Sequence, residues 1–177
     1  MRVIGGEFRS RRLKSLPGLE VRPTPDRLRE TLFDVLQSRV QGVVFLDAYA
    51  GTGAVGIEAL SRGASQAILI ERGRAAVELI RENLEALGLA GRAQVVHGKV
   101  TLWLPRLRAD IVFLDPPYTL EAEYGAALSL LAQRPPLLAV VQHAARFELE
   151  PEYSGFERKR VLRQGDNALS FYSSGAA

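Results

Sequence analysis

Four consecutive residues are best suited to chemistry: Asp115, Pro116, Pro117 and Tyr118, which follow the apolar run Ile111–Leu114. A strand that ends in this way presents a carboxylate, backbone carbonyls and a flat aromatic ring at one point. Proline carries no N–H, so these carbonyls find few amide partners nearby. Hydrogen-bond acceptors beside a stacking surface suit a planar amino group of the kind that a nucleobase carries. The alternative, a strand that merely ends in a proline turn, is common for Asp-Pro alone.

A second motif lies upstream, where another apolar strand ends in Asp47-Ala48-Tyr49-Ala50-Gly51-Thr52-Gly53. Glycines let a backbone approach a ligand closely and adopt positive φ angles. In an open parallel sheet, ligands bind beyond the carboxyl ends of the strands, at the point where the strand order reverses. A plain strand–turn–helix is the alternative. We expect a cofactor loop whose contacts come from Asp47, Ala48, Tyr49, Gly51 and Gly53.

The same loop also matches the G-x-G-x-x-G spacing of dinucleotide sites, through Gly51, Gly53 and Gly56. Two features argue against a dinucleotide. Asp47 would repel a pyrophosphate, whereas it would attract an ammonium group or a sulfonium-bearing amino acid. In addition, no second domain is left to hold a hydride donor or acceptor. The loop therefore predicts a nucleotide-like cofactor with a cationic part.

Two further strand ends are expected to line the same pocket. Glu71 ends the next apolar strand and could accept both hydroxyls of a ribose, as an acid does at a similar spacing in dinucleotide folds. A solvated strand-end acid is the alternative for Glu71. Gly98 ends the third strand and could line an adenine pocket with the backbone that follows it. The predicted cofactor residues outside the glycine loop are Glu71, Arg72, Gly98, Lys99 and Val100.

Length and composition exclude several classes of protein. With 177 residues, of which 47% are hydrophobic and 24% charged, the chain has the size and make-up of one globular domain. There are no cysteines for disulfides or thiolate metal sites, and two histidines are too few for a histidine metal centre, so we expect no metal. No stretch reaches the roughly 18 apolar residues of a membrane span, and the N-terminus lacks the apolar core of a secretory signal. We therefore expect a cytoplasmic protein without a membrane partner.

Basic residues are concentrated near the N-terminus. The formal net charge of the whole chain is only +3, but residues 1–22 hold six basic side chains against two acidic ones. Arginine outnumbers lysine 20 to 3, and guanidinium groups bind phosphates bidentately and stack on bases. A basic arm on a nearly neutral body indicates a polyanionic partner, although each charge alone could be a solvated surface residue. The residues expected to bind this polyanion are Arg2, Arg9, Arg11, Arg12, Lys14 and Arg22.

The pattern of apolar residues predicts where helices and strands lie. Residues 1–24 are expected to form the basic arm or a short hairpin, and residues 25–177 the main domain. Strands are expected at 43–47, 67–71, 94–98, 110–115 and 137–143, and helices at 25–39, 54–62, 74–87, 101–107 and 121–133. Two more strands, 156–163 and 168–173, flank the turn residues 164–167 and should form an antiparallel hairpin.

This order of elements predicts the fold class α/β. Near-continuous apolar strands separated by helices indicate a buried, mostly parallel sheet with helices on both faces. The terminal hairpin makes the sheet mixed, with about seven strands. The motifs at Asp47 and Asp115 should then be neighbours at one edge of the sheet.

Taken together, the motifs at residues 47–53 and 115–118 and the acid at Glu71 resemble those of class I S-adenosylmethionine-dependent methyltransferases that modify amines. The stretches RVIGGEFRSRRL, RPTPDRLRETLFDVL and DAYAGTGAVGIEALSRGA, followed by DPPY, are similar to the RsmD family. The resemblance covers nearly the whole chain, and it implies a Rossmann-like class I methyltransferase fold.

The resemblance implies methyl transfer from S-adenosyl-L-methionine to the exocyclic N2 of a guanine in 16S ribosomal RNA, with S-adenosyl-L-homocysteine as the product. It implies that Asp115 and the Pro116 carbonyl accept hydrogen bonds from the N–H groups of the amine. It also implies that Pro117 keeps the turn rigid and that Tyr118 stacks on the extruded base. The basic arm would hold RNA phosphates. The implied partner is 16S rRNA within the assembled or assembling 30S subunit, and we expect a monomer.

Some positions need separate comment. The family keeps the segment of Arg22 and Thr24 against the active site, so both are expected to face the cofactor pocket. Lys99 stands where many relatives carry an acid, so the contact with adenine is expected from backbone alone. Residues 133–160 are less typical of the family, and their role stays open.

Three other functions are weighed. A DNA adenine or cytosine amino-methyltransferase would use the same chemistry, but it usually needs a sizeable target-recognition region. A protein glutamine methyltransferase favours Asn at the position of Asp115 and carries a larger helical N-terminal domain. A non-catalytic RNA-binding protein with a methyltransferase shell would not need Asp47, Glu71 and Asp115 intact.

Overall fold

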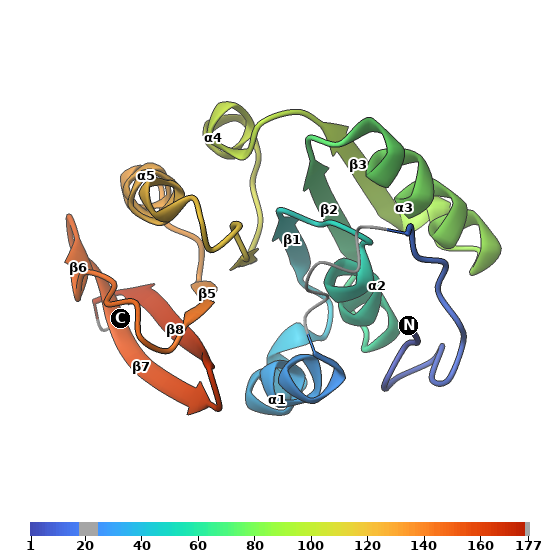
Figure 1. Ribbon diagram of the computed structural model, residues 1–177, viewed down its shortest axis with the longest axis horizontal. Coiled ribbons are helices and arrows are strands. Elements are labelled where there is room, and N and C mark those ends of the chain that lie inside the picture. The colour runs from blue at the N-terminus through green and yellow to red at the C-terminus, as the bar shows by residue number, and fades with distance from the viewer. Residues whose placement is uncertain (18–24, 176–177) are drawn as a thin grey trace.

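The structure is a computed structural model that describes residues 1–17 and 25–175 (Figure 1). Arg22 and Thr24 lie outside the described residues. The helices are α1 (Asp26–Leu36), α2 (Ala54–Ser61), α3 (Arg74–Ala86), α4 (Val100–Trp103) and α5 (Glu121–Gln133), with 3-10 turns η1 (Gln37–Val40), η2 (Ala90–Arg92) and η3 (Leu104–Arg106). The strands are β1 (Val44–Ala48), β2 (Gln66–Glu71), β3 (Ala93–His97), β4 (Ile111–Leu114), β5 (Leu138–Ala144), β6 (Glu152–Tyr153), β7 (Phe156–Gln164) and β8 (Asn167–Ser174).

Within the described residues, eight strands form one sheet in the order β3-β2-β1-β4-β5-β8-β7-β6. The first five in this order are parallel, and β8, β7 and β6 are antiparallel. The predicted mixed sheet with a C-terminal hairpin is thus confirmed, and the two-residue strand β6 is the addition that prediction lacked. No helix in the described parts of the chain is long and apolar enough to cross a membrane.

The strand order reverses between β1 and β4. From β1 the chain moves outward through β2 to β3, then returns to the other side of β1 to build β4 and β5. Asp47 pairs in register with Phe113, and Ala48 pairs with Leu114, so β1 and β4 end at the same edge. The loops that leave these two strands turn to opposite sides, and this is where open α/β sheets bind ligands.

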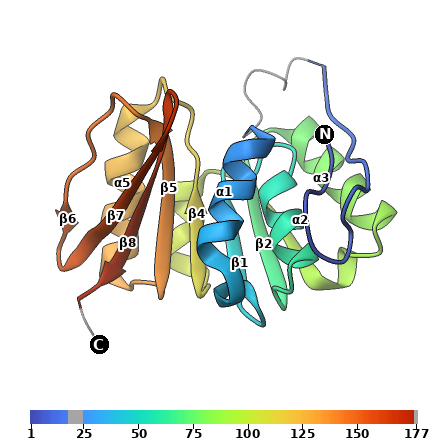
Figure 2. The same ribbon diagram turned by 90° about the horizontal axis from the view of Figure 1, so that it is seen from below.

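Helices cover both faces of the sheet. Successive residues of a strand face opposite sides of the sheet, so Phe45 and Phe113 pack under α1 whereas Leu46 and Val112 pack under α5. A third apolar cluster joins α2 and α3 to the outer strands β2 and β3. Figure 2 shows β7 and β8 at one end of the sheet and the N-terminal segment at the other end, beside α2 and α3.

Two predicted helices differ in length from the observed ones. The helix expected over 25–39 ends as an α-helix at Leu36, because Gln37 takes a φ of 46° and the chain continues as η1. The helix expected over 101–107 is a single α-turn, α4, followed by η3. Pro105 accounts for this second break, since it has no N–H to continue an α-helical ladder.

The described part of the arm, residues 1–17, packs against the domain. Backbone hydrogen bonds join Val3 to Ser10 and Arg11, and an isolated bridge joins Arg2 to Arg12. They close the segment into a loop, which is its hairpin-like feature. Val3 and Leu13 are buried in the apolar cluster of α2 and α3. The arm therefore contributes to the same core as the cofactor-side helices, while the division into a 1–24 extension and a 25–177 domain stays a prediction.

Candidate functional site

Three carboxylates, those of Asp47, Glu71 and Asp115, gather at the carboxyl ends of β1, β2 and β4. The Asp47 side chain is only 1% exposed. Burial raises the pKa of Asp47 to about 8; a 2.9 Å hydrogen bond from the Gly56 amide opposes this rise, and the charges of Asp115 and Glu71 add to it. A cationic ligand among these acids would favour their charged forms. In the described residues, no group of three or more histidine, aspartate or glutamate side chains is arranged to hold a metal ion.

The glycine loop makes a tight turn from β1 into α2. Gly51 and Gly53 have φ angles of 57° and 79°, in the left-handed region that glycine adopts readily. A side chain at Gly53 would begin 3.1 Å from Cγ1 of Ile80, so this position also needs a small residue for space. The turn brings the positive N-terminal end of α2 next to Asp47, whose carboxylate accepts from Gly56.

The Glu71 carboxylate bridges the glycine loop after β1 and the loop after β2. Its Oε2 accepts a 2.8 Å hydrogen bond from the amide of Gly51, and its Oε1 accepts a 2.7 Å bond from the amide of Gly73. The predicted ribose contact of Glu71 stays a prediction, but the carboxylate lies beside the glycine loop as that role requires. Arg72 is exposed, and its backbone carbonyl lies 3.1 Å from Nε2 of His97.

The end of β3 is shaped by a residue that the sequence did not single out, Trp103. A Cβ added to Gly98 would lie 2.4 Å from Nε1 of Trp103, so the indole ring occupies the space beside this glycine. Lys99 is exposed, whereas Val100 is buried at the start of α4. As the only tryptophan of the chain, Trp103 could have been flagged from its place shortly after a strand-end glycine.

The residues predicted to be catalytic lie directly after β4. Asp115 and Tyr118 are half-buried and Pro116 is buried. The Pro116 carbonyl lies 3.5 Å from the hydroxyl of the buried Tyr124 on α5, at the limit of a hydrogen bond. The hydroxyl of Tyr118 donates a 2.7 Å bond to Oδ1 of Asn167. Sequence reasoning missed both contacts, because Asn167 was expected only as a turn residue and Tyr124 only as part of a helix.

Tyr49 connects the cofactor loop to the other face of the sheet. Its backbone φ is 67°, an unusual value for a residue other than glycine. Its hydroxyl donates a 2.7 Å hydrogen bond to Oε2 of Glu123 on α5. Burial raises the pKa of the Tyr49 phenol, and the hydrogen bond to the Glu123 carboxylate raises it further. The tyrosine thus ties the loop after β1 to the helix that follows the Asp115 motif.

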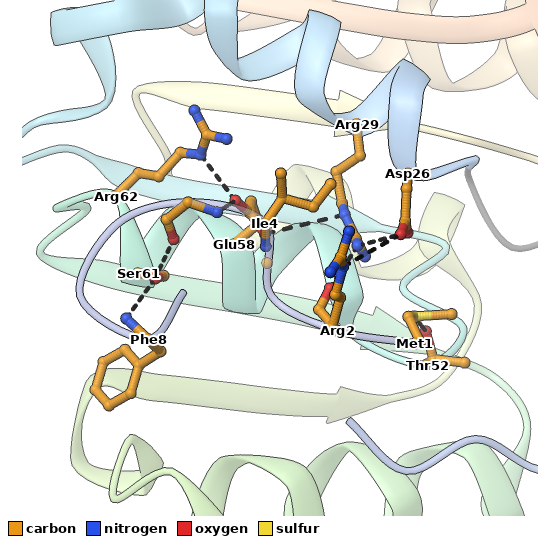
Figure 3. Close-up of polar contacts among 12 residues, drawn as sticks. Met1, Arg2, Ile4, Phe8, Asp26, Arg29, Thr52, Glu58, Ser61 and Arg62 are labelled. Carbon is orange, nitrogen blue, oxygen red and sulfur yellow. Dashed lines mark hydrogen bonds and ion pairs between the residues drawn. The ribbon is translucent and has the colours of Figure 1, made fainter. Parts of the chain in front are cut away.

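The arm is held by buried polar side chains of α2, as Figure 3 shows. Glu58, with no exposed surface, accepts hydrogen bonds of 2.9 and 2.8 Å from the amides of Ile4 and Gly5. Ser61 accepts from the amide of Phe8 and donates to the carbonyl of Gly5. These contacts involve the arm backbone, so they leave the basic side chains of the arm unoccupied.

A buried arginine completes the attachment of the arm (Figure 3). Arg29 on α1 donates a 2.6 Å bond to the carbonyl of Arg2 and a 3.0 Å bond to Asp26, and its Nε lies 3.9 Å from Glu58. Burial lowers the pKa of Arg29, while the charges of Glu58 and Asp26 act in the opposite direction. Arg29 therefore joins the arm, α1 and α2 at one point.

All five described basic residues of the arm that were predicted to bind RNA are exposed: Arg2, Arg9, Arg11, Arg12 and Lys14. Arg2 lies 4.0 Å from Asp26, and Lys14 lies 2.9 Å from Glu82. For the other three, the described part of the chain supplies no ion pair. The arm therefore presents these exposed cations on a backbone that is fixed to the domain.

Comparisons with known proteins agree with this architecture. A family model described as "Conserved hypothetical protein 95" matches residues 1–173. The chain is 43% identical over 120 residues to ribosomal RNA small subunit methyltransferase D of Escherichia coli K12, a match that covers 67% of this chain and 60% of that protein. The chain thus matches less than two thirds of the length of this relative.

Two solved structures share the fold. The hypothetical protein TTHA0928 of Thermus thermophilus is 35% identical, with a TM-score of 0.82, over 98% of this chain and 99% of that chain. An RNA methyltransferase from Salinibacter ruber, solved with S-adenosyl-L-homocysteine, is 16% identical, with a TM-score of 0.68, over 88% and 96% of the two chains. The second likeness shows the fold alone, a Rossmann-like methyltransferase fold as predicted. Because the family model matches residues 1–173, nearly the whole of this chain, the chain belongs to the RsmD family.

Proposed function

We propose that this protein transfers a methyl group from S-adenosyl-L-methionine to the exocyclic N2 of a guanine in 16S ribosomal RNA. The single observation that carries the proposal is the meeting of Asp47, Glu71 and Asp115 at the point where the strand order reverses. Family membership supports the substrate, since the matched Escherichia coli relative is named as a small-subunit rRNA methyltransferase.

The charge of the pocket supports the cofactor. S-adenosylmethionine carries a sulfonium and an ammonium group. Burial, with the charges of Asp115 and Glu71, raises the pKa of Asp47, so a cation bound beside this side chain would stabilise its ionised form. In this proposal Asp47 and the glycine loop hold the amino-acid part, Glu71 accepts the ribose hydroxyls, and Gly98 lies beside the adenine. Arg72, Lys99 and Val100 would contribute backbone contacts. Thr24 keeps its predicted role at this pocket.

The chemistry needed from the chain is positioning of the amine. When bound, S-adenosylmethionine supplies an electrophilic methyl group, whose bond to sulfur breaks as the bond to N2 forms and a neutral thioether is left. The lone pair of a guanine amine is delocalised into the ring. The amine would donate hydrogen bonds to the Asp115 carboxylate and to the Pro116 carbonyl. These two bonds would turn the lone pair toward the methyl group. Tyr118 would stack on the base and Pro117 would keep the turn rigid.

The same acceptors would favour the transition state over the ground state. As the new N–C bond forms, the nitrogen gains positive charge, so its interaction with the Asp115 carboxylate strengthens. The methylated nitrogen then loses one proton, either to Asp115 or to water. The Pro116 carbonyl has a second lone pair available beside its long contact with Tyr124.

The exposed arm supports an RNA partner. Arg2, Arg9, Arg11, Arg12, Lys14 and Arg22 would bind phosphates, which position the substrate without reading its sequence. We propose that the substrate is 16S rRNA within the assembled or assembling 30S subunit. We further propose that the protein acts as a monomer in the cytoplasm.

The test is transfer of tritiated methyl from S-adenosylmethionine to 30S particles that lack this modification, followed by mass analysis of the nucleosides. The expected product is N2-methylguanosine at one position. Asp115→Ala should abolish transfer while binding of the cofactor persists. Asp34→Ala, which removes an exposed carboxylate on α1, is the matched control and should keep full activity. Full activity of Asp115→Ala, or a methyl group on another base, would overturn the proposal.

A further inference from the structure

A hollow of about 270 Å³ lies beside the proposed amine-binding groups, with Tyr118 as one of its walls. It is bounded by the loop after β4, the first turns of α5 and the loop after β5. Its lining residues are Tyr118, Glu121, Tyr124, Ala144, Arg146 and Phe147. Neither Asp115 nor Pro116 lines it, so the hollow is adjacent to the amine-binding groups and distinct from them.

The walls of the hollow are aromatic and well supported. The rings of Tyr124 and Phe147 lie 5.1 Å apart between centroids. Tyr124 is 2% exposed and also meets the edge of the His143 ring at 6.5 Å. A backbone bond of 2.9 Å from Phe147 to Ala144 fixes the loop after β5. The aromatic surface is therefore held in place by packing and by backbone hydrogen bonds before any ligand arrives.

The rim of the hollow carries one cation and one anion. Arg146 and Glu121 are exposed, and in the described residues neither side chain forms an ion pair. An arginine without an intramolecular partner can bind a phosphate. A carboxylate at the same place can accept from an amino group on a base edge, as it does from cytosine N4. Together these groups match the parts of one nucleotide: a flat base, an edge with donors and a phosphate.

We propose that this hollow binds the nucleotide adjacent to the methylated guanine in single-stranded RNA. The base of that nucleotide stacks against Phe147 beside Tyr118, Arg146 binds the phosphate, and Glu121 selects a base with an amino group. This inference rests on the proposed function, because it extends the RNA site by one nucleotide. The volume of the hollow is slightly below the roughly 300–1,000 Å³ of pockets that enclose a whole small-molecule ligand. A hollow of this size fits a single base.

A stacking surface next to the Asp115 motif is what the neighbouring base needs. A guanine whose amine lies at Asp115 must be unstacked from its neighbours in the RNA, which leaves the next base without its partner. Aromatic rings that replace lost base stacking are the usual way in which proteins hold single strands. The hollow supplies such rings just beyond the catalytic turn, on the same side of the sheet as α5.

The experiment measures equilibrium binding of short single-stranded RNAs, which contain one guanine with a varied neighbour, to protein loaded with S-adenosylhomocysteine. Binding is measured without catalysis, so it reports on the hollow even if methyl transfer to rRNA fails. Arg146→Ala and Phe147→Leu should each weaken binding roughly tenfold. Arg134→Ala, which removes an exposed arginine after α5, is the matched control and should leave binding unchanged.

A second variant tests the selection of the base and does not depend on the packing of Phe147. Wild-type protein should bind RNA with cytosine beside the guanine more tightly than RNA with uracil. Glu121→Gln should reduce this difference, because an amide can donate to a uracil carbonyl as well as accept. Equal binding of both RNAs by the wild type, or unchanged binding by Arg146→Ala, would overturn the inference. The proposed function would still stand in that case if methyl transfer were normal.

A crystal structure with a guanine-containing dinucleotide decides where each base lies. The neighbour of the guanine is expected against Phe147, with its phosphate near Arg146. If the guanine itself occupied the hollow, with its amine away from Asp115, the inference would be wrong.

Discussion

The hydroxyl of Tyr118 donates a hydrogen bond of 2.7 Å to Oδ1 of Asn167, and this bond joins the loop after β4 to the first residue of β8. Asn167 is itself anchored, because it pairs with Ala144 in the antiparallel ladder of β5 and β8. The C-terminal hairpin thus has a role at the site: it fixes the ring that is proposed to stack on the target base.

The first prediction concerns this bond. Tyr118→Phe keeps the ring but removes the hydroxyl, and Asn167→Ala removes the acceptor. Each change should lower kcat/KM for RNA roughly fivefold, as expected for about 1 kcal/mol from one hydrogen bond. If Asn167 acts through the Tyr118 hydroxyl, the double variant should be no worse than either single variant.

Steady-state kinetics of the four proteins measure this coupling. Asp166→Ala alters the exposed turn residue that precedes Asn167 and serves as the control. If the losses in kcat/KM of the two single variants multiply in the double variant, Asn167 does not position Tyr118.

Residues with local sequence signals were predictable. Asp47 and Asp115 stand at the ends of apolar strands, and Gly51 and Gly53 occupy a turn that needs positive φ angles, so their types and positions indicate their surroundings. The parallel sheet followed from the alternation of apolar strands and helices. These inferences use neighbours in the chain, which a sequence displays directly.

Long-range polar pairs were not predictable in the same way. The Tyr49–Glu123 bond and the attachment of the arm to Glu58 join residues far apart in the chain, and no periodicity marks either partner. Glu58 even lies on a helix among apolar residues, where a sequence pattern predicts a solvated glutamate. The burial is explained by the docked arm, which aims two amides at the carboxylate, and by Arg62, whose Nε donates a 2.8 Å hydrogen bond to it.

The second prediction concerns the attachment of the arm. Glu58→Ala removes the acceptor of the Ile4 and Gly5 amides and leaves the Arg29 guanidinium buried without this carboxylate. The free energy of unfolding should fall by roughly 3–5 kcal/mol, as for other broken buried ion pairs. Denaturant titration measures the loss.

The control for this prediction is Glu78→Ala on α3. Its carboxylate is exposed and pairs with Arg81 one turn along the same helix, so the loss should stay below about 0.5 kcal/mol. Equal losses in the two variants would mean that Glu58 does not hold the arm.

The third prediction uses Gly98 and Trp103. In Gly98→Ala the new methyl group would lie 2.4 Å from Nε1 of Trp103, so the indole ring must move. Overpacking of this kind should cost roughly 1–3 kcal/mol of stability and weaken cofactor binding. Because Trp103 is the only tryptophan, its fluorescence reports the displacement directly. Gly91→Ala, where an added Cβ meets nothing within 4 Å, should leave the spectrum as it is in the wild type.

The fourth prediction is a pH dependence that originates at Asp47. Burial raises its pKa in the folded state to about 8, from an ordinary value of 3.8. The folded protein therefore holds a proton that the unfolded chain releases between these values, so the stability of the unliganded protein should fall as pH rises across this window. Asp47→Asn should remove this part of the slope, which thermal unfolding at several pH values measures.

The same titration should appear in cofactor binding with the opposite sign. A cationic ligand favours the ionised form of Asp47, so the affinity for S-adenosylmethionine should rise with pH up to about 8, by at most roughly tenfold per pH unit. Calorimetry in buffers of different ionisation enthalpy should detect release of a proton on binding below this pH. An affinity that does not change between about pH 6 and pH 8 would remove Asp47 from the cofactor site.

The fifth prediction concerns the exposed arm. If Arg9, Arg11 and Arg12 each bind one phosphate, replacing all three with alanine should reduce the slope of log K against log salt for RNA binding by about two. The arm backbone is held through Glu58 and Ser61, so these substitutions should leave the fold intact. The matched control replaces three exposed arginines that precede β1, β4 and β5, at the edge of the sheet opposite the site: Arg39, Arg108 and Arg134. Because both triple variants lose the same charge, a general electrostatic effect would lower both slopes alike, whereas binding through the arm lowers only the first.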